Sequence, residues 1–311
     1  MNGIINVLKP PGMTSFDVVA YLRRILNTKK IGHAGTLDPA AAGVLPICAG
    51  NATKSIEYIM DMEKTYRAEL TLGVSTDTQD SFGQIIESHK IDVSADRIAK
   101  IINCFVGEIE QVPPMFSALR VGGKRLYEMA REGKVIERKP RKIFINSINI
   151  INIKDNKVLV DIICSKGTYI RTLCSDIGDA LGCGGHMSFL IRKKTGIFEI
   201  DSSYTLEDIT EAVEYDKIYD ILRPTDKVFK SFDDIFLNSD DGKRFRNGNY
   251  IDLNNQVIDN ASSFKYDCNV DIICNIGTIL KVYDDKKHFI GLGEIINIDG
   301  RCFIKPKKMF N

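Results

Sequence analysis

The stretch GHAGTLDPAAAGVLP, residues 32–46, decides how the chain is interpreted because it places one carboxylate, Asp38, among small and apolar residues. Gly35 and Gly43 let the backbone approach a ligand closely, which suits a flat ligand bound beside an acid. A second interpretation is local. Asp38 is able to cap a short helix that begins at Pro39 and ends at Gly43. The residues alone leave both interpretations open, since a capped turn also fixes the carboxylate in place.

Length and composition describe an ordinary folded protein. With 311 residues the chain is longer than most single domains, so two domains are expected. Its 44% hydrophobic and 27% charged residues exclude a disordered or collagen-like chain. The N-terminus lacks a signal-peptide pattern, and no window approaches the roughly 20 apolar residues of a membrane span. We therefore expect a cytoplasmic protein without a membrane partner.

The cysteines and histidines do not form a metal-binding pattern. The eight cysteines include no C-x-x-C pair, and the four histidines are scattered along the chain. Structural metal sites use closely spaced ligands, so no metal site is expected. Most of the cysteines lie in apolar stretches, which predicts buried, reduced thiols.

Positive charge is concentrated in one segment although the whole chain carries only +1. Residues 120–142 hold nine Lys or Arg, among them Lys124, Arg125 and Arg131, and only three Glu. A basic segment is often just a solvated surface, but glycines inside this one favour a mobile arm. Nucleic acid is the natural polyanion for such an arm.

Helical and strand patterns alternate without a regular βαβ rhythm, which indicates an α+β fold. Ser15 is expected to cap a helix with apolar residues at positions 18, 19, 22, 25 and 26. Residues 66–72 alternate as a strand with one buried face. Two β-rich stretches meet in a hairpin at Asp155 and Asn156, and a later helix ends at Gly182.

The last part of the chain has a different character. Residues 205–241 are acidic and lose strand character, which places a boundary near Pro224. Beyond it, short strands are expected at 271–273, 279–283, 289–296 and 302–306. The pattern predicts a small, compact β domain.

Seven ordered motifs identify a family. They are LKPPGMTSFDVV from Leu8, GHAGTLDPAAAGVLP from Gly32, KTYRAEL from Lys64, TDTQDSFGQ from Thr76, SALRVGGKRLYEMAREG from Ser117, SKGTYIRTLCSDIG from Ser165 and GGHMSFLIRKKTG from Gly184. Over nearly its whole length the chain resembles the bacterial tRNA pseudouridine synthases of the TruB type, which modify uridine 55 of the T-loop. The tail resembles a PUA domain through GKRFRNGNYI and FIGLGEI.

The resemblance implies a fold and a division of the chain. Residues 1–225 would form the catalytic domain, with a mixed, largely antiparallel sheet flanked by helices. Residues 226–311 would form a small PUA-like β-barrel that binds RNA. The basic segment corresponds to a mobile RNA-clamping insertion at about residues 117–142. Its basic side chains suit contacts with the RNA backbone.

Three residues match the family's catalytic positions. Asp38 matches the catalytic aspartate of the G-T-L-D-P motif, an assignment that outweighs a role as a cap alone. Arg171 matches the arginine that pairs with this carboxylate, although spacing alone would make it a solvated surface residue. Tyr66 matches a tyrosine that stacks on the target base and is a candidate to take its C5 proton. Its plain interpretation is an aromatic at the edge of the core.

Other motif residues receive supporting roles from the same resemblance. His33 matches a histidine that fills the gap left by a flipped nucleotide, where a single loop histidine would be the plain interpretation. Tyr169 and Leu190 match residues that line the uracil pocket, while Leu190 suits a core position in any fold. Lys9 and Pro10 match a motif that supports the Asp38 loop and is not itself catalytic.

The implied reaction is the isomerisation of uridine to pseudouridine in tRNA, with no cofactor, no obligate protein partner and a monomeric enzyme. Three routes stay open for Asp38: attack on C1′, attack on C6, or removal of the 2′ proton. Alternatives are a synthase for another RNA, a guide-RNA-dependent synthase, and a non-catalytic RNA-binding protein or tRNA-folding chaperone. A metal-dependent hydrolase built on Asp38 and His33 is remote because a second ligand cluster is missing.

Overall fold

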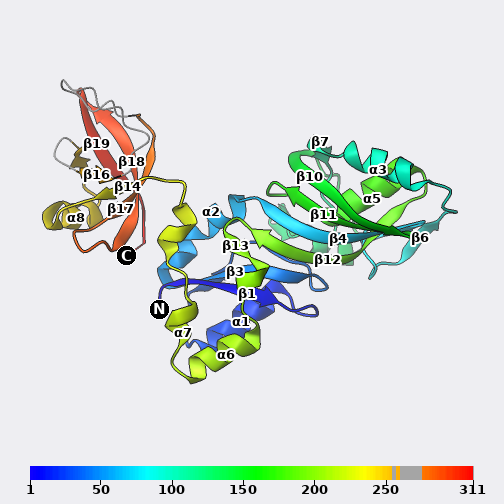
Figure 1. Ribbon diagram of the computed structural model, residues 1–311, viewed down its shortest axis with the longest axis horizontal. Coiled ribbons are helices and arrows are strands. Elements are labelled where there is room, and N and C mark those ends of the chain that lie inside the picture. Colours follow the sequence, from blue (N-terminus) through cyan, green and yellow to red (C-terminus); the bar gives the residue numbers. More distant parts are fainter. Residues whose placement is uncertain (254–256, 260–274, 311) are drawn as a thin grey trace.

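The computed structural model describes residues 1–253, 257–259 and 275–310. Its main feature is a nine-stranded sheet (Figure 1), whose strands run in the spatial order β1-β3-β12-β4-β11-β10-β7 with β2 and β13 attached at β3 and β12. The strands are β1 (Gly3–Lys9), β2 (Ile31–His33), β3 (Ala42–Ala49), β4 (Lys64–Leu72), β7 (Gly107–Gln111), β10 (Arg141–Lys154), β11 (Lys157–Cys164), β12 (Gly185–Thr195) and β13 (Phe198–Glu199). Only β3 and β12 pair in parallel, so the predicted mixed, largely antiparallel sheet is confirmed.

Helices cover this sheet in two groups. At one end α1 (Ser15–Ile25), α6 (Leu206–Glu214) and α7 (Ile218–Ile221) pack against β1 and β3 (Figure 1). At the other, α3 (Ala95–Asn103) and α5 (Ile170–Leu181) pack on β4, β10, β11 and β12. The sequence pattern was sufficient to predict α5, including its end at Gly182, whose φ of 76° suits glycine.

Two insertions project from the sheet. The strands β5 (Val74–Thr76) and β6 (Ile85–Ser88) form a hairpin that follows β4 and contacts β12. The basic segment contains β8 (Arg120–Val121), β9 (Lys124–Arg125) and α4 (Leu126–Arg131). Its basic side chains Lys124, Arg125 and Arg131 are exposed, as a polyanion-binding arm requires.

The C-terminal part is a curled, half-barrel sheet with the order β15-β19-β18-β17-β14-β16. Its elements are β14 (Asp234–Phe236), α8 (Ser239–Arg246), β15 (Ile251–Asp252), β16 (Val257–Asp259), β17 (Ile279–Tyr283), β18 (Phe289–Ile298) and β19 (Arg301–Met309). The strands predicted at 279–283, 289–296 and 302–306 are confirmed. The one expected at 271–273 lies outside the described residues.

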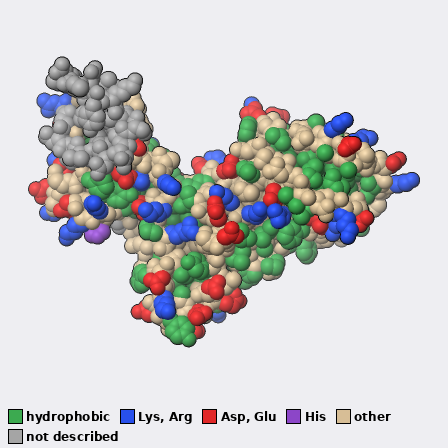
Figure 2. All heavy atoms as spheres, viewed as in Figure 1, with side chains coloured by type: hydrophobic (Ala, Val, Ile, Leu, Met, Phe, Trp, Pro, Cys, Tyr) green, Lys and Arg blue, Asp and Glu red, His purple; other side chains and the backbone are tan. Residues whose placement is uncertain are grey.

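An aromatic cluster joins this sheet to the main body. Phe229, in the short 3-10 helix Thr225–Phe229, packs edge-on against Tyr58 of α2 (Ile56–Asp61) at a centroid distance of 5.0 Å. The same ring lies 5.9 Å from Phe289 and 5.5 Å from Phe310 of the tail. The α2 helix follows a second 3-10 helix, Gly50–Ser55. Positive and negative side chains are mixed over the face shown in Figure 2.

Two local predictions, on the cap of α1 and on the cysteines, were wrong, and one of the two interpretations left open for Asp38 is excluded. The N-cap of α1 is Thr14, which forms a capping box with Asp17, because the hydroxyl of Ser15 instead bonds to the backbone of Leu37. Asp38 does not cap a helix, since only a turn follows it before β3. Among the cysteines, Cys104 is exposed and Cys302 is disulfide-bonded, so the expectation of buried, reduced thiols fails at both. Periodicity does not show which side chains the fold brings together.

Four further cysteines, Cys48, Cys164, Cys174 and Cys183, are free and buried as predicted. No helix in the described part of the chain is long and apolar enough to cross a membrane.

Candidate active site

The loop that carries Asp38 connects β2 to β3 and is held in place by the chain's first two motifs. The Ser15 hydroxyl accepts a hydrogen bond from the Leu37 amide at 2.9 Å. The ammonium of Lys9, fully buried at the end of β1, donates to the carbonyls of Pro10, Met13 and Pro39 at 2.8, 2.6 and 3.2 Å. Lys9 therefore fixes the residue next to Asp38, the supporting role that the resemblance implies for it.

A second buried cation holds the other side of the loop. Arg192 of β12 is only 1% exposed, and its guanidinium donates to three carbonyls, those of Val44, Thr36 and Gly35, at 2.8, 3.3 and 3.1 Å. A Cβ at Gly43, where φ is 115°, would lie 2.3 Å from the Arg192 carbonyl oxygen. The loop therefore requires glycine at this position so that β3 can approach β12.

Arg192 lies within a quoted motif, but the sequence interpretation gave it no role. One signal was available. Arg192 follows Leu190 by two residues, so an alternating strand places both side chains on the same, inward face. A charged residue at an inward position indicates a specific set of polar partners.

Asp38 meets Arg171 in front of this loop. Arg171, in the first turn of α5, has a side chain that is 6% exposed, whereas the Asp38 side chain is 37% exposed. The Arg171 Nε lies 2.9 Å from Asp38 Oδ2, and Nη2 donates to Oδ1 at 3.3 Å. The structure thus brings together the acid and the cation that the sequence motifs paired, across 133 positions of the chain.

The electrostatics of Asp38 balance opposing effects. Burial raises the pKa of Asp38 above its ordinary value, and the Arg171 guanidinium is the strongest influence that lowers it. The carboxylate of Asp80 raises the pKa further, and Lys9 lowers it. Burial also lowers the pKa of Lys9 to about 8, with Asp38 opposing that shift. The Arg171 guanidinium therefore favours the ionised form of Asp38.

Asp80 is a further site residue that was quoted in a motif without a role. Its Oδ2 lies 3.6 Å from Nη1 of Arg171, and its side chain is 17% exposed. The preceding Gln79, at a φ of 62°, accepts a hydrogen bond from Thr172 of α5 at 2.8 Å. Arg171 also donates to the carbonyls of Thr78 and Phe116 at 3.2 and 2.8 Å. The arginine is thus fixed from several sides.

Tyr66 and Leu190 lie on adjacent strands behind Asp38. Tyr66 of β4 is opposite Arg192 in the register with β12, where Leu190 is opposite Ala68. Both side chains are largely buried, in one core cluster that includes Leu37 from the Asp38 loop. Burial raises the pKa of the Tyr66 phenol; Arg192 opposes this and Asp38 adds to it. The arrangement forms an apolar wall with one neutral phenol next to the acid.

His33 and Tyr169 are half-buried at the border of the same region. His33 ends β2, and its Nδ1 has no hydrogen-bond partner among the described residues. Burial and the charge of Arg192 lower the pKa of His33, which favours a neutral imidazole. The backbone of Tyr169 is fixed by Gln111, whose side chain bonds to both its amide and its carbonyl at 2.8 and 3.1 Å.

The three basic arm residues are separate from this group. Arg125 and Arg131 both lie over the ring of Tyr127, at 5.8 and 5.5 Å from its centroid. Within the described residues, neither these two nor Lys124 forms an ion pair with a carboxylate. Phe116, one residue before the arm, provides the link to the site through its bond to Arg171. Unpaired, exposed cations are available to an anionic partner.

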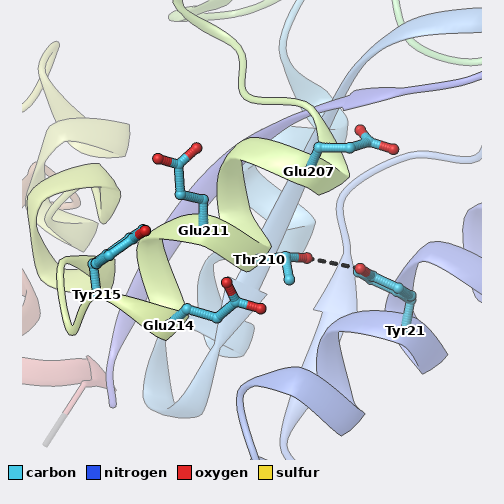
Figure 3. Close-up of a pocket in the computed structure, with 6 residues that line it drawn as sticks. All are labelled: Tyr21, Glu207, Thr210, Glu211, Glu214 and Tyr215. Atoms are coloured by element: carbon cyan, nitrogen blue, oxygen red, sulfur yellow. Dashed lines mark hydrogen bonds between the residues drawn. The ribbon is translucent and has the colours of Figure 1, made fainter.

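Two other features do not belong to the site. In the part of the chain that the structure describes, no group of three His, Cys, Asp or Glu is placed to hold a metal ion. The pocket in Figure 3 lies between α1 and α6 and is lined by Tyr21, Glu207, Thr210, Glu211, Glu214 and Tyr215. It contains none of the residues around Asp38, and its three glutamates disfavour an anionic ligand.

The buried guanidinium of Arg192 leads to a stability prediction. Replacement by methionine, Arg192→Met, should lower the free energy of unfolding by about 3 kcal/mol, because three carbonyls would be left without their donor. The matched control is Lys193→Met, the next residue, which is 34% exposed and pairs with Asp161 at the surface. This control should lower the free energy of unfolding by less than about 1 kcal/mol. If urea denaturation gives the same small decrease in the free energy of unfolding for both variants, Arg192 does not hold the loop.

Comparison with known proteins places this geometry in a family. The "TruB family pseudouridylate synthase (N terminal domain)" matches residues 23–170, and the "tRNA pseudouridylate synthase B C-terminal domain" matches residues 171–230. The tRNA pseudouridine synthase B of Alkaliphilus oremlandii (strain OhILAs) is 47% identical over 299 residues, 96% of this chain and 95% of that protein. The enzyme of the same name from Clostridioides difficile (strain 630) is 44% identical and covers 100% of both chains.

Solved structures show the same fold. The "Crystal Structure of a Cbf5-Nop10-Gar1 Complex" contains a chain that matches with a TM-score of 0.74 and 26% identity, over 99% of this chain and 85% of that one. The "archaeal box H/ACA sRNP Nop10-Cbf5 complex" matches with a TM-score of 0.72 and 25% identity, over 99% and 86%. With full-length relatives and matching domains, the chain belongs to the TruB family of tRNA pseudouridine synthases, which are isomerases.

Proposed function

We propose that this enzyme converts uridine 55 in the T-loop of tRNA to pseudouridine, with Asp38 as its essential residue. The observation that carries the proposal is the contact between Asp38 and Arg171, an acid and a buried cation at the edge of an apolar wall. Such a pair keeps a carboxylate ionised where water is largely excluded. The full-length similarity to tRNA pseudouridine synthases supports the choice of substrate.

The reaction requires little more than this set of residues. The bond between ribose C1′ and uracil N1 breaks, the base rotates, and a bond forms between C1′ and C5. The C5 proton leaves and N1 gains a proton, so substrate and product are isomers and no redox cofactor is needed. Three alternative roles in this isomerisation stay open for Asp38: attack on C1′, attack on C6, or removal of the 2′ proton. Each requires the ionised carboxylate that Arg171 favours.

Neighbouring side chains would hold the detached uracil until it recombines. The apolar surface of Leu190 and the ring of Tyr66 suit the faces of a flat base, and Tyr169 borders the same region. Stacking by Tyr66 requires only its ring. Acceptance of the C5 proton would require the phenolate, which Arg192 favours and burial opposes.

The position of Asp38 also favours base flipping. Its side chain is 37% exposed, and a nucleotide that leaves the RNA stack would bring the target C1′ to it. Flipping leaves a gap in the stack. His33, whose Nδ1 has no partner among the described residues, is the side chain that we assign to this gap.

The remaining parts would bind the tRNA outside the target nucleotide. We assign residues 1–225 to catalysis and the segment 117–142 to clamping, with Lys124, Arg125 and Arg131 on phosphates. Residues 226–311 are assigned to a PUA-like RNA-binding domain. We propose a cytoplasmic monomer that works without a protein partner or guide RNA. The chain is 47% identical to a bacterial tRNA pseudouridine synthase B and only 26% identical to the matching chain of the Cbf5-Nop10-Gar1 complex, which supports an enzyme that works alone.

Two alternatives are tested by the same assays. A synthase for another RNA would act through Asp38 but would not depend on position 55 of tRNA. A tRNA-folding chaperone would bind tRNA without any chemical step. The retained set of Asp38, Tyr66 and Arg171 favours an enzyme over a protein that only binds RNA.

Replacement of the acid tests the central assignment. With tRNA that carries tritium at uridine C5, the wild-type enzyme should release tritium without added metal, and Asp38→Asn should be slower by about 10³-fold or more. The control Asp216→Asn makes the same chemical change at an exposed residue with a φ of 57°, which asparagine tolerates, and should retain the wild-type rate. A tRNA without uridine 55 should release nothing. Full activity of Asp38→Asn would refute the proposal.

The role of the arm has a separate test in the salt dependence of tRNA binding. Removal of one Lys or Arg that neutralises a phosphate should reduce the slope of log K against log salt by up to about one unit. The combined change Lys124→Gln, Arg125→Gln and Arg131→Gln should therefore flatten the slope by up to about three units. Lys217→Gln, an exposed residue between α6 and α7, serves as control and should leave the slope unchanged. If the slope of the triple variant equals that of the wild type, these arm residues do not contact phosphates of the bound tRNA.

A further inference from the structure

Phe82, in the turn between β5 and β6, is 80% exposed and is the most exposed aromatic side chain in the described residues. Single exposed apolar residues are common and require no explanation. Phe82 differs because Ile85 and Ile86, three and four residues later, are also 66% and 62% exposed. The hairpin thus presents an apolar tip to solvent without a covering element among the described residues.

The turn that carries Phe82 is fixed by its own hydrogen bonds. Oδ1 of Asp80 accepts from the Phe82 amide at 3.0 Å and from the Thr78 hydroxyl at 2.7 Å. The side chain of Asp77 accepts from the Gln84 amide at 2.8 Å, and the Asp77 amide donates back to the Gln84 carbonyl at 3.1 Å. The backbone beneath the exposed ring is therefore ordered before any ligand binds, which reduces the entropy cost of binding.

The same turn is attached to the catalytic centre. The other oxygen of Asp80, Oδ2, faces Arg171 Nη1 at 3.6 Å, and Arg171 contacts Asp38 at 2.9 Å. Ser81 donates its amide to the Met187 carbonyl at 3.1 Å, which fastens the turn to β12. One carboxylate thus bonds to the backbone of Phe82 and lies beside the arginine of the site. The backbone of Phe82 is consequently linked to Arg171 through a single carboxylate, that of Asp80.

The chemistry of this turn selects one kind of contact. Asp77 and Asp80 make the turn acidic, which is unsuitable for a phosphate. An aromatic ring, by contrast, stacks on any base because every base has a π-face. RNA that delivers one flipped nucleotide to Asp38 has unstacked bases on either side of it.

We propose that Phe82 is a stacking platform for an RNA base next to the target nucleotide. The inference rests on the proposed function, because it takes RNA as the substrate. The proposed contact tolerates any base and differs in type from the contacts of the arm. The arm attracts phosphates through charge, whereas Phe82 binds a base by stacking on its ring. A protein partner on the hairpin is the competing occupant, and the test separates the two.

The absence of tryptophan from the chain makes a direct test possible. Phe82→Trp places a single indole at the tip, and its emission should be quenched when tRNA binds. The matched control is Tyr215→Trp, at another exposed aromatic position (67%) directly after α6, which packs against β1 at one end of the main sheet; its emission should not change. If tRNA changes the emission of Phe82→Trp no more than that of Tyr215→Trp, base stacking is contradicted. A protein partner would then be the remaining ligand for the hairpin tip.

Affinity gives the second measurement. Phe82→Ala should weaken tRNA binding by about 5- to 150-fold, the range for one stacked base, while Phe82→Trp retains wild-type affinity. The salt slope should not change, because the ring carries no charge. Wild-type affinity of Phe82→Ala would overturn the inference.

The two proposals fail in different ways. If the wild type releases tritium from uridine 55 but Phe82→Ala binds tRNA as the wild type does, only the stacking inference is wrong. If the wild type releases no tritium while the indole of Phe82→Trp is quenched by RNA, the stacking contact stands and the proposed reaction is wrong.

Discussion

The rest of the candidate site depends on the contact between the carboxylate of Asp38 and the buried guanidinium of Arg171. Burial and the nearby Asp80 raise the pKa of Asp38, and the 2.9 Å contact with Arg171 is the main opposing influence. The contact requires α5 to begin opposite the loop between β2 and β3, so the packing of α5 on the sheet determines whether the site exists. Arg171 is in turn fixed by the carbonyls of Thr78 and Phe116.

The loop on the other side of this ion pair is held by two buried cations, Lys9 and Arg192. Lys9 and Arg192 together donate to six backbone carbonyls, and three of these, those of Gly35, Thr36 and Pro39, belong to the loop that carries Asp38. Buried cations are costly unless their donors are satisfied. Their position next to Asp38 and Tyr66 means that they also set the charge of the site, since Arg192 opposes the rise in the pKa of Tyr66.

Local patterns in the sequence were sufficient to predict elements with a regular buried face, such as the amphipathic helix α5 and the alternating strand β4. They were insufficient where distant residues decide. Thr14 and Ser15 are equally good caps by type, and only the contact of Ser15 with Leu37 assigns the cap to Thr14. Arg171 was paired with Asp38 through family motifs, because spacing alone favours a surface residue. Asp80 and Arg192 were missed, since their partners are carbonyls and side chains from other motifs.

The pH dependence of single-turnover tritium release, with enzyme in excess over tRNA, tests the dependence of Asp38 on Arg171 most directly. The wild-type rate should fall as the pH drops through the pKa of Asp38, because protonation removes the reactive carboxylate. In Arg171→Gln the cation that lowers this pKa is gone, so the acid limb of the residual rate should move to higher pH. Arg67→Gln, which breaks a surface pair with Asp161, should keep the wild-type profile. An acid limb that stays in place in Arg171→Gln would contradict the account.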